Sequence, residues 1–285
     1  MSEPNFFVVG APKCATSSLY SYLQQHPNVF VPDVKEPHFF SSPEVNETYY
    51  DVPRVQELSA YLSLYRDGAD MPLRGDFSPS YLFYPVAAER IYNFNPKARI
   101  IVMLRDPVKR ALSHYLMDVR LNYKKAELLD ILRHPKEHVQ FFREYVEVSQ
   151  YATKLKVYLE LFGVENVGVF LFEDFKADPH KVMSNILTFL GQDPSFTFDM
   201  EEKHNAYHMP KSQWVESFRQ STFWKGVRHR VPASLKNTIK PILDHTEKPD
   251  MTREEDLLRQ LLRSDVQALE SVIGYKIQAW GVSTS

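Results

Sequence analysis

The sequence predicts an α/β fold, a three-layer sandwich in which helices cover both faces of a central, mostly parallel sheet. The first observation is that short apolar runs, typical of buried strands, alternate with segments of helical periodicity along the chain. The second is that 9 glycines stand beside 19 prolines, a balance that favours well-defined loops over flexible linkers. The third is that no repeat or low-complexity run divides the chain, so we expect one domain over residues 1–285.

The first half of the chain alternates extended and helical segments. Residues 6–9 are apolar and predict a buried strand, and residues 17–25 place apolar side chains on one helical face. An extended segment is expected around residues 29–31, between prolines. The remaining expected elements are a helix over residues 54–65, a short strand and turn over 74–81, and a helix over 85–93.

The second half begins with an apolar run over residues 99–104, which predicts another buried strand. The next helix starts cleanly, because Asp106 stands as its N-cap and Pro107 at its first position. The other expected elements are a long helix over about 145–162 that stops at Gly163, a strand over 167–172, a helix over 179–190 that ends at Gly191, and a capping box at 252–255 that opens the last long helices, to about residue 273.

The composition is that of an ordinary soluble protein, with 44% hydrophobic and 25% charged residues. The net charge is −2, so no global field attracts nucleic acid and any anion site must be local. Cys14 is the single cysteine, which excludes an internal disulfide and favours a reducing, cytoplasmic compartment. We expect no signal peptide and no membrane span, and the sequence leaves the oligomeric state open.

Residues 10–18 follow the first strand and open the first helix. Such a turn gathers backbone N–H groups at a helix N-terminus, where the helix dipole favours an anion. Lys13 adds a positive charge, and three hydroxyl residues follow at 16–18. The nucleotide-triphosphate loop has the pattern G-x-x-x-x-G-K-[ST], but here Ala15 stands at the second glycine and Thr16 at the lysine. The displaced lysine indicates an anion cradle of a different kind.

A second candidate anion site follows the strand at 99–104, at the carboxyl end where ligands bind in open parallel sheets. Arg105 comes first, and Ser113 follows about two helical turns later. An arginine fork suits a phosphate dianion, although an arginine here can also pair with a carboxylate at the sheet edge. Two candidate anion-binding sites together favour a ligand with two separated anionic groups.

Two further segments place ionisable groups beside aromatic side chains, as acid–base sites often do. In the first, Glu36 and His38 precede a phenylalanine pair at 39–40. In the second, Asp76 lies just before a Ser-Pro-Ser turn. Taken alone, each segment is also compatible with an ordinary role, such as a surface ion pair for Glu36 or a packed histidine for His38.

Together these residues resemble the sulfotransferases that use 3′-phosphoadenosine 5′-phosphosulfate (PAPS), over nearly the whole chain. Residues 10–18 (GAPKCATSS) are similar to the family's 5′-phosphosulfate loop, and residues 105–113 (RDPVKRALS) match its 3′-phosphate motif R-D-P-x-x-R-x-x-S. Residues 158–174 look like its later helix and strand, and residues 203–212 resemble the loop that closes over the nucleotide. Residues 36–40 (EPHFF) resemble the bacterial and glycosaminoglycan-type branch more than the cytosolic phenol-type branch.

The resemblance implies in-line transfer of a sulfuryl group from PAPS to a hydroxyl, or an amine, on a small-molecule or carbohydrate acceptor, with adenosine 3′,5′-bisphosphate as the product. Glu36 would be the general base with His38 in support, and Lys13 would stabilise charge on the leaving bridging oxygen. No obligatory metal is expected. The expected nucleotide-binding residues are Ala11, Pro12, Lys13, Cys14, Ala15, Thr16, Ser17, Ser18, Arg105, Ser113, Lys203, Tyr207 and Lys211.

Alternatives exist for the base and for the acceptor. Asp76 is the rival base, and His204 and His208 on the closing loop are weaker rivals. Phe77 stands where the branch often has a lysine, and Ser41 where it can have an acidic residue. In that branch both positions help to hold sugar acceptors.

Two other classes of protein stay open. The first is a small-molecule P-loop kinase, which would need a lysine at position 16, where this chain has Thr16. The second is a nucleotide-binding protein without catalysis, in which Glu36 is merely structural. Residues 212–249 mix aromatic and basic side chains, and they suit either a solvated helical face or a lid over an anionic or sugar-like acceptor.

Overall fold

The computed structural model describes residues 3–49, 52–200, 209–210, 244–245 and 249–281 of the chain. Within this part, one five-stranded sheet has the order β2-β3-β1-β4-β5, and every neighbouring pair is parallel. Its strands are β1 (Phe6–Gly10), β2 (Val29–Phe30), β3 (Leu73–Phe77), β4 (Arg99–Leu104) and β5 (Val167–Leu171). A separate antiparallel pair joins β6 (Met209–Pro210) to β7 (Asp244–His245). The predicted α/β class with a parallel sheet is confirmed.

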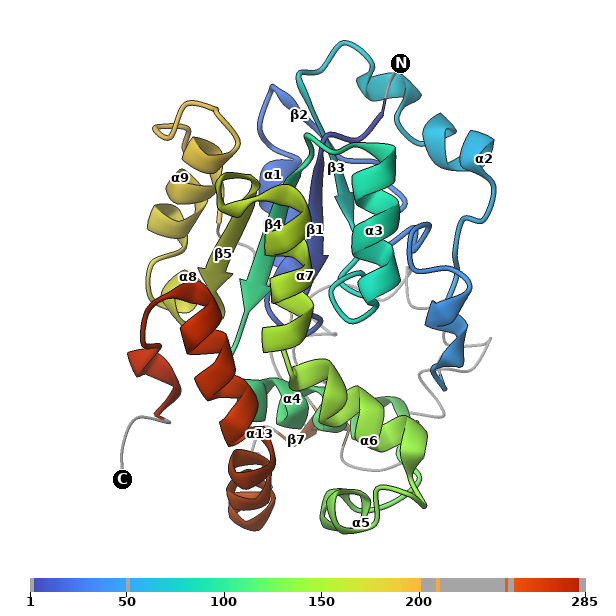
Figure 1. Cartoon of the computed structure of the whole chain (residues 1–285), viewed down its shortest axis with the longest axis vertical. Coiled ribbons are helices and arrows are strands. Elements are labelled where there is room, and N and C mark those ends of the chain that lie inside the picture. Colours follow the sequence, from blue (N-terminus) through green and yellow to red (C-terminus); the bar gives the residue numbers. More distant parts are fainter. Residues whose placement is uncertain (1–2, 50–51, 201–208, 211–243, 246–248, 282–285) are drawn as a thin grey trace.

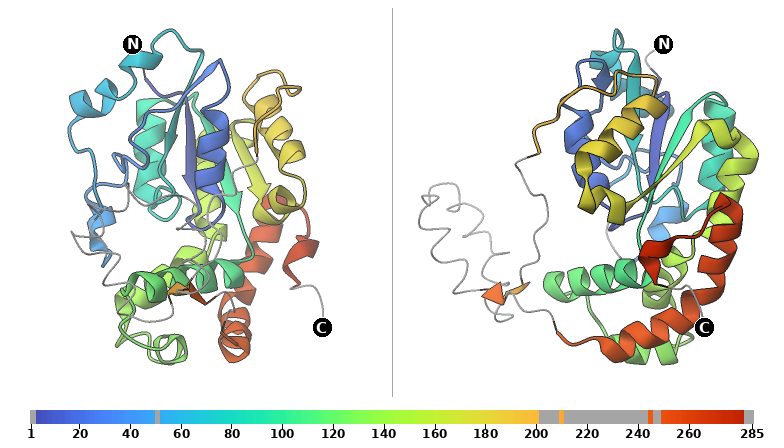
Figure 2. Two further views of the ribbon diagram at one scale, coloured as in Figure 1. Left: turned by 180° about the vertical axis from the view of Figure 1, so that it is seen from behind. Right: turned by 90° about the vertical axis from the view of Figure 1, so that its left-hand side faces the viewer.

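Helices lie on both sides of the sheet (Figure 1). In that view α3 (Pro85–Phe94) and α7 (Ala152–Phe162) lie in front of it, and the view from behind in Figure 2 shows α1 (Thr16–Leu23) across the opposite face. The long α13 (Thr252–Ile273) packs against α7 and α4 (Pro107–Leu121). The remaining α-helices of the described residues are α2 (Leu58–Ser63), α5 (Leu128–Arg133), α6 (Val139–Tyr145), α8 (Phe172–Ala177) and α9 (Pro179–Phe189).

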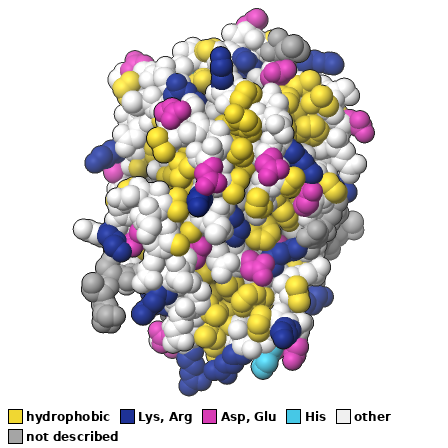
Figure 3. Space-filling view, in the orientation of Figure 1, with side chains coloured by type: hydrophobic (Ala, Val, Ile, Leu, Met, Phe, Trp, Pro, Cys, Tyr) yellow, Lys and Arg dark blue, Asp and Glu magenta, His cyan; other side chains and the backbone are white. Residues whose placement is uncertain are grey.

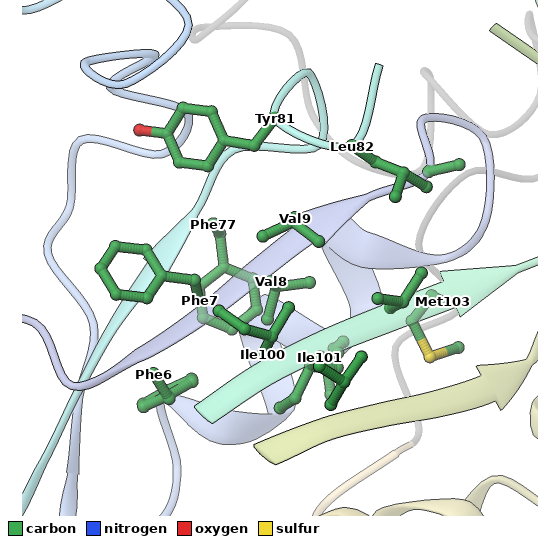
Figure 4. Packing of buried hydrophobic residues seen from close by; sticks show 14 of the residues in the cluster. Phe6, Phe7, Val8, Val9, Phe77, Tyr81, Leu82, Ile100, Ile101 and Met103 are labelled. Atoms are coloured by element: carbon green, nitrogen blue, oxygen red, sulfur yellow. The ribbon is translucent and has the colours of Figure 1, made fainter. Parts of the chain in front are cut away.

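The central strands are buried along almost their whole length, which explains why they are continuous apolar runs rather than alternating patterns. All residues of β1 are buried, and in β4 only Arg99, at the start, is partly exposed. Figure 4 shows the aromatic and aliphatic side chains of β1, β3 and β4 packed together around this centre. Because this core holds the strands in place, their carboxyl ends form a rigid edge on which a binding site can be built.

The strand order places the switch point of the sheet at β1, because β3 lies on one side of it and β4 on the other. Ligands bind outside the carboxyl ends of the strands at such a point. The carboxyl ends point to the lower end of Figure 1, where α4 and α6 lie. Gly10 ends β1 under the turn that follows β3, and a Cβ there would come within 2.6 Å of Leu82 Cβ. A glycine is therefore required at this crossing.

The prediction of a single long helix over residues 145–162 is wrong. A 3₁₀ turn (Glu147–Ser149) separates α6, which ends at Tyr145, from α7, which starts at Ala152. Distant side chains take the backbone groups that a continuous helix would use. Arg110 Nη2 donates to the carbonyl oxygens of Glu144 and Tyr145, at 2.6 and 2.9 Å. The Asp265 carboxylate of α13 accepts from the first N–H groups of the α7 region, with 2.6 Å to the nitrogen of Tyr151.

Other helix boundaries also differ from the expectation. The capping box at 252–255 does not form, because the Thr252 hydroxyl donates to Asp250 at 2.6 Å and Met251 is the N-cap. The helix expected over 54–65 is only α2, since the nitrogen of Val55 donates instead to the carbonyl oxygen of Pro37 at 2.9 Å. The short helices α5, α6 and α8 were not expected, and Phe172 begins α8 rather than ending β5.

The predicted N-cap of α4 is confirmed, because the Asp106 carboxylate accepts hydrogen bonds from the nitrogens of Val108 and Lys109. Basic and acidic side chains are interspersed over most of the face shown in Figure 3, in keeping with the small net charge. In the part of the chain that the structure describes, no helix has the length and apolar character needed to cross a membrane.

Candidate active site

The anion loop, residues 10–18, joins β1 to α1 at the switch point. The nitrogen of Ala11 donates to the carbonyl oxygen of Met103 in β4 at 2.7 Å, which fixes the start of the loop on the sheet. Lys13 and Ala15 have φ values of 70° and 64°, in the left-handed region that glycine adopts most easily. Ala15 is the N-cap of α1 and supplies no side-chain cap, and the first turn of α1 has no acidic residue. The leading N–H groups of α1 therefore suit an anion.

Lys13 is the charged group of the loop. Its Nζ lies 3.3 Å from the Sδ of Met117 in α4, so the side chain spans from the loop to that helix. Burial lowers the pKa of Lys13 to about 8, and the positive charges of Arg120, Arg110 and Arg105 act in the same direction. The ammonium is thus charged at neutral pH but poorly stabilised, which favours the approach of an anion.

The other side chains of the loop have different environments. Cys14 is buried in the core, and burial raises the pKa of its thiol to about 12. It is not a thiolate nucleophile, and only its backbone can face a ligand. Thr16 is also buried, whereas Ser17 and Ser18 are partly exposed. The Oγ of Ser17 accepts a hydrogen bond from Lys35 Nζ at 2.9 Å.

Arg105 follows β4, as expected, and reaches the anion loop. Its Nη1 donates to the carbonyl oxygen of Lys13 at 3.1 Å, and its guanidinium carbon lies 4.5 Å from the centre of the Phe172 ring. The buried Nε has no hydrogen-bond partner among the described residues. Such an orphaned donor is costly unless a ligand satisfies it, which fits an anion at this position. Ser113 lies in the second turn of α4 and is partly exposed.

The base segment, residues 35–41, lies beside the anion loop. The carboxylate of Glu36 lies between two cationic or titratable groups, with Oε1 2.6 Å from Lys35 Nζ and Oε2 3.7 Å from His38 Nε2. The other ring nitrogen of His38, Nδ1, is 2.7 Å from Ser80 Oγ. Burial lowers the pKa of His38, although the charge of Glu36 opposes that shift. The imidazole is therefore neutral near pH 7 and fixed in orientation.

A buried carboxylate, that of Asp76 in β3, supports the base segment through the hydroxyl groups that surround it. Asp76 has no exposed surface, and it accepts hydrogen bonds from the hydroxyls of Tyr61, Ser78 and Tyr81 at 2.7, 2.7 and 2.9 Å. Burial raises the pKa of Asp76 to about 6, against the lowering effect of these three hydroxyls. We call Asp76 and the three hydroxyl residues the Asp76 cage.

The Asp76 cage holds the base segment through its backbone. The nitrogen of His38 donates to Ser78 Oγ at 3.2 Å, and the nitrogen of Phe40 donates to the hydroxyl of Tyr81 at 3.3 Å. Asp76 is therefore placed to position the segment and has no surface for contact with an acceptor. The sequence indicated Asp76 as an alternative base, but it did not indicate the three hydroxyl groups that donate hydrogen bonds to this carboxylate.

Of the expected nucleotide-binding residues, the structure brings Arg105 into contact with the anion loop. Lys35, which was not among the expected nucleotide-binding residues, also contacts this loop through Ser17. The signal for Lys35 was present in the sequence, since it directly precedes Glu36. The expected contributions of Lys203, Tyr207 and Lys211, and the rival bases His204 and His208, lie outside the described residues. Among the residues that the structure covers, no cluster of His, Cys, Asp or Glu side chains could hold a metal ion.

Comparisons with known proteins agree on one family. The "Sulfotransferase domain" family matches residues 3–259. Mouse carbohydrate sulfotransferase 15 is 26% identical over 262 residues, covering 71% of this chain and 45% of that protein. Mouse heparan sulfate glucosamine 3-O-sulfotransferase 6 is 29% identical over 189 residues, covering 66% of this chain and 52% of that protein. This chain thus spans about half the length of these curated relatives.

A solved structure covers the whole length. The crystal structure of a sulfotransferase from Alicyclobacillus acidocaldarius is 30% identical to this chain and superimposes with a TM-score of 0.74. The match covers 99% of this chain and 100% of that one.

Proposed function

The chain belongs to the sulfotransferase domain family, and from that premise we propose that it transfers a sulfuryl group from PAPS to a hydroxyl acceptor. The observation that carries the proposal is the meeting of two anion-binding groups and a carboxylate at one sheet edge. Arg105 contacts the backbone of the anion loop, and Lys35 joins Ser17 of that loop to Glu36.

The two phosphate positions of PAPS are assigned to separate elements. The N–H groups at the start of α1, with the hydroxyls of residues 16–18, bind the 5′-phosphosulfate. Arg105 binds the 3′-phosphate, with Ser113 two helical turns further on, and the unpartnered Nε of Arg105 supports this role. Lys203, Tyr207 and Lys211 complete the set of nucleotide-binding residues in this proposal.

Transfer is an in-line displacement at sulfur. The acceptor oxygen forms a bond to sulfur while the bond between sulfur and the bridging oxygen breaks, and adenosine 3′,5′-bisphosphate leaves. Lys13 stabilises the charge that develops on the bridging oxygen. The acceptor's proton passes to the carboxylate of Glu36, whose Oε2 lies 3.7 Å from His38 Nε2. The protein thus contributes positioning and charge stabilisation, and no metal takes part in these steps.

The acceptor in this proposal is a hydroxyl on a carbohydrate or a small molecule, with an amine as a further option. The names of two relatives, a carbohydrate sulfotransferase and a heparan sulfate glucosamine 3-O-sulfotransferase, support a carbohydrate. One sulfotransferase domain over residues 1–285 and a cytoplasmic location complete the proposal, the latter because Cys14 is the single cysteine. A screen of acceptors with PAPS, read by mass spectrometry, identifies the product.

Nucleotide binding tests the proposal before any acceptor is known. We expect adenosine 3′,5′-bisphosphate to raise the unfolding temperature far more than ATP with Mg²⁺ does, and the reverse result would favour a kinase. In calorimetry, Arg105→Ala should weaken the bisphosphate much more than adenosine 5′-monophosphate, because only the former has a 3′-phosphate. Arg133→Ala, at an exposed arginine of α5, is the matched control. An equal loss for both nucleotides would place Arg105 elsewhere.

A further inference from the structure

Lys35 connects the two halves of the site with one ammonium group. Its Nζ lies 2.6 Å from Glu36 Oε1 and 2.9 Å from Ser17 Oγ. Ser17 belongs to the first turn of α1, and Glu36 belongs to the segment that follows β2. An ammonium has three N–H donors, so it can hold both oxygens and still turn one donor toward a ligand.

The three partners differ in how firmly they are held. The backbone nitrogen of Glu36 donates to the carbonyl oxygen of Phe77 in β3 at 3.1 Å, and Ser17 is fixed by its helix. The Lys35 side chain is 26% exposed and the Glu36 side chain 36% exposed, so their ion pair lies at the protein surface. Such pairs contribute little to stability because water screens them. The lysine, on its flexible stem, is the member that can change partner most easily.

We propose that Lys35 is a shared cation, paired with Glu36 in the free protein and passed to the anion that binds at the anion loop. This inference rests on the proposed function and deepens it. A phosphosulfate at the loop offers several anionic oxygens near Ser17, in the favourable field of the α1 N-terminus. It competes with a single screened carboxylate and draws the ammonium away. Glu36 then loses its cationic partner and accepts the proton of the acceptor only when the co-substrate is present.

The exchange of partners implies a reciprocal coupling. If Glu36 competes with the nucleotide anion for Lys35, removing the carboxylate must strengthen anion binding, and it must do so through Lys35. A direct repulsion between Glu36 and the anion would also strengthen binding on removal of Glu36, but to the same extent whether or not Lys35 is present. A double-mutant cycle separates these two cases.

The experiment measures the dissociation constant of adenosine 3′,5′-bisphosphate by calorimetry for wild type, Lys35→Gln, Glu36→Gln and the double variant. We expect Lys35→Gln to weaken binding roughly tenfold, the loss of one partly exposed charge-assisted hydrogen bond. Glu36→Gln should tighten binding several-fold in the wild-type background and by less than about twofold in the Lys35→Gln background. Lys97→Gln, at an exposed lysine, is the control.

The outcomes are separable from those of the proposed function. Equal effects of Glu36→Gln in both backgrounds would overturn the sharing of Lys35 while leaving the sulfotransferase proposal intact. Failure of the wild type to bind the bisphosphate would overturn both. Lys35→Arg, which keeps the charge, should bind within a few-fold of wild type, and a loss as large as that of Lys35→Gln also counts against a shared cation. Thermal unfolding of each variant shows whether it is folded.

Discussion

The anion loop and the base segment meet at Lys35, but different forces hold them. The anion loop is shaped by its own backbone, through left-handed residues and the start of a helix that follows directly in the chain. The base segment has left-handed residues too, at Glu36 and His38, but it is tied to hydroxyls some forty positions away. A site made of backbone tolerates side-chain changes, whereas a site suspended from a buried polar network is sensitive to each member of that network.

The largest effect that should distinguish the two regions is that of Glu36→Gln. Loss of a general base lowers kcat by roughly 10²–10⁴, and we expect a value in the upper part of that range. Nucleotide binding should be retained and, once Lys35 is released from the carboxylate, tightened several-fold. Steady-state kinetics and calorimetry on the same preparation check both statements, with Glu57→Gln as an exposed control. Loss of nucleotide binding together with turnover would make Glu36 structural.

The next effect concerns Lys13, on the anion-loop side of the comparison. Lys13→Ala should lower kcat by roughly 10²–10³, the usual result of removing one donor that stabilises developing charge. The pKa of Lys13 is lowered to about 8, so the ammonium is charged below that pH and neutral above it. The profile of kcat/KM should therefore fall as the pH rises through about 8. Lys13→Arg should move this fall to higher pH, and an unmoved limb would assign it to another group.

Asp76→Asn tests the network beneath the base segment. We expect kcat to fall roughly tenfold, since a misplaced catalytic group is costly even when it is intact. Nucleotide affinity should stay within about twofold, because no cage residue belongs to the anion loop. Tyr158→Phe removes a buried hydroxyl outside the cage, one that donates to the carbonyl oxygen of Tyr81 at 3.0 Å, and serves as the control. A fall in nucleotide affinity equal to that in kcat would contradict the separation of the two regions.

The same variant has a signature in stability. The pKa of Asp76 is raised from 3.8 to about 6 by burial, so the folded state holds this proton more tightly than the unfolded state. The ionised group costs stability above pH 6, and that cost disappears as the pH falls from about 6 to 3.8. A difference of two pKa units corresponds to about 3 kcal/mol. Relative to wild type, Asp76→Asn should therefore gain in unfolding free energy as the pH is raised from 4 to 7, as measured by urea denaturation.

The comparison also explains which parts of the site the sequence could predict. The anion loop and Arg105 were predictable because each follows an apolar run that had to be a central strand, and the ends of parallel strands share one edge. The enzyme class, a sulfotransferase, is confirmed by the family match, which rests on those same motifs. The fold class was predictable for the same reason.

The remaining features depend on contacts between distant residues. The Asp76 cage needs Tyr61 from α2 to reach β3, and nothing local to either residue indicates that pairing. The break between α6 and α7 depends on Arg110 and Asp265, which lie about 35 and 114 positions away from the groups they bind. The helices α5 and α6 have 6 and 7 residues, too short for periodicity to reveal.

The smallest effect is expected at Ala15 of the anion loop, a non-glycine residue in a conformation that glycine adopts most easily. Ala15 adopts a left-handed conformation with φ of 64°, which costs a residue with a Cβ roughly 1–2 kcal/mol. Ala15→Gly removes that cost. It also raises the conformational entropy of the unfolded chain, which lowers the free energy of unfolding by about 0.4–1 kcal/mol. The net change should be a stabilisation of between zero and about 1.6 kcal/mol, with nucleotide affinity unchanged because the N–H groups of α1 stay in place. Ala268→Gly, at an exposed position inside α13, should be destabilising instead, since a helical conformation suits alanine better than glycine. The two substitutions are chemically identical, so opposite signs in urea denaturation would show that backbone conformation, rather than side-chain contact, shapes the anion loop.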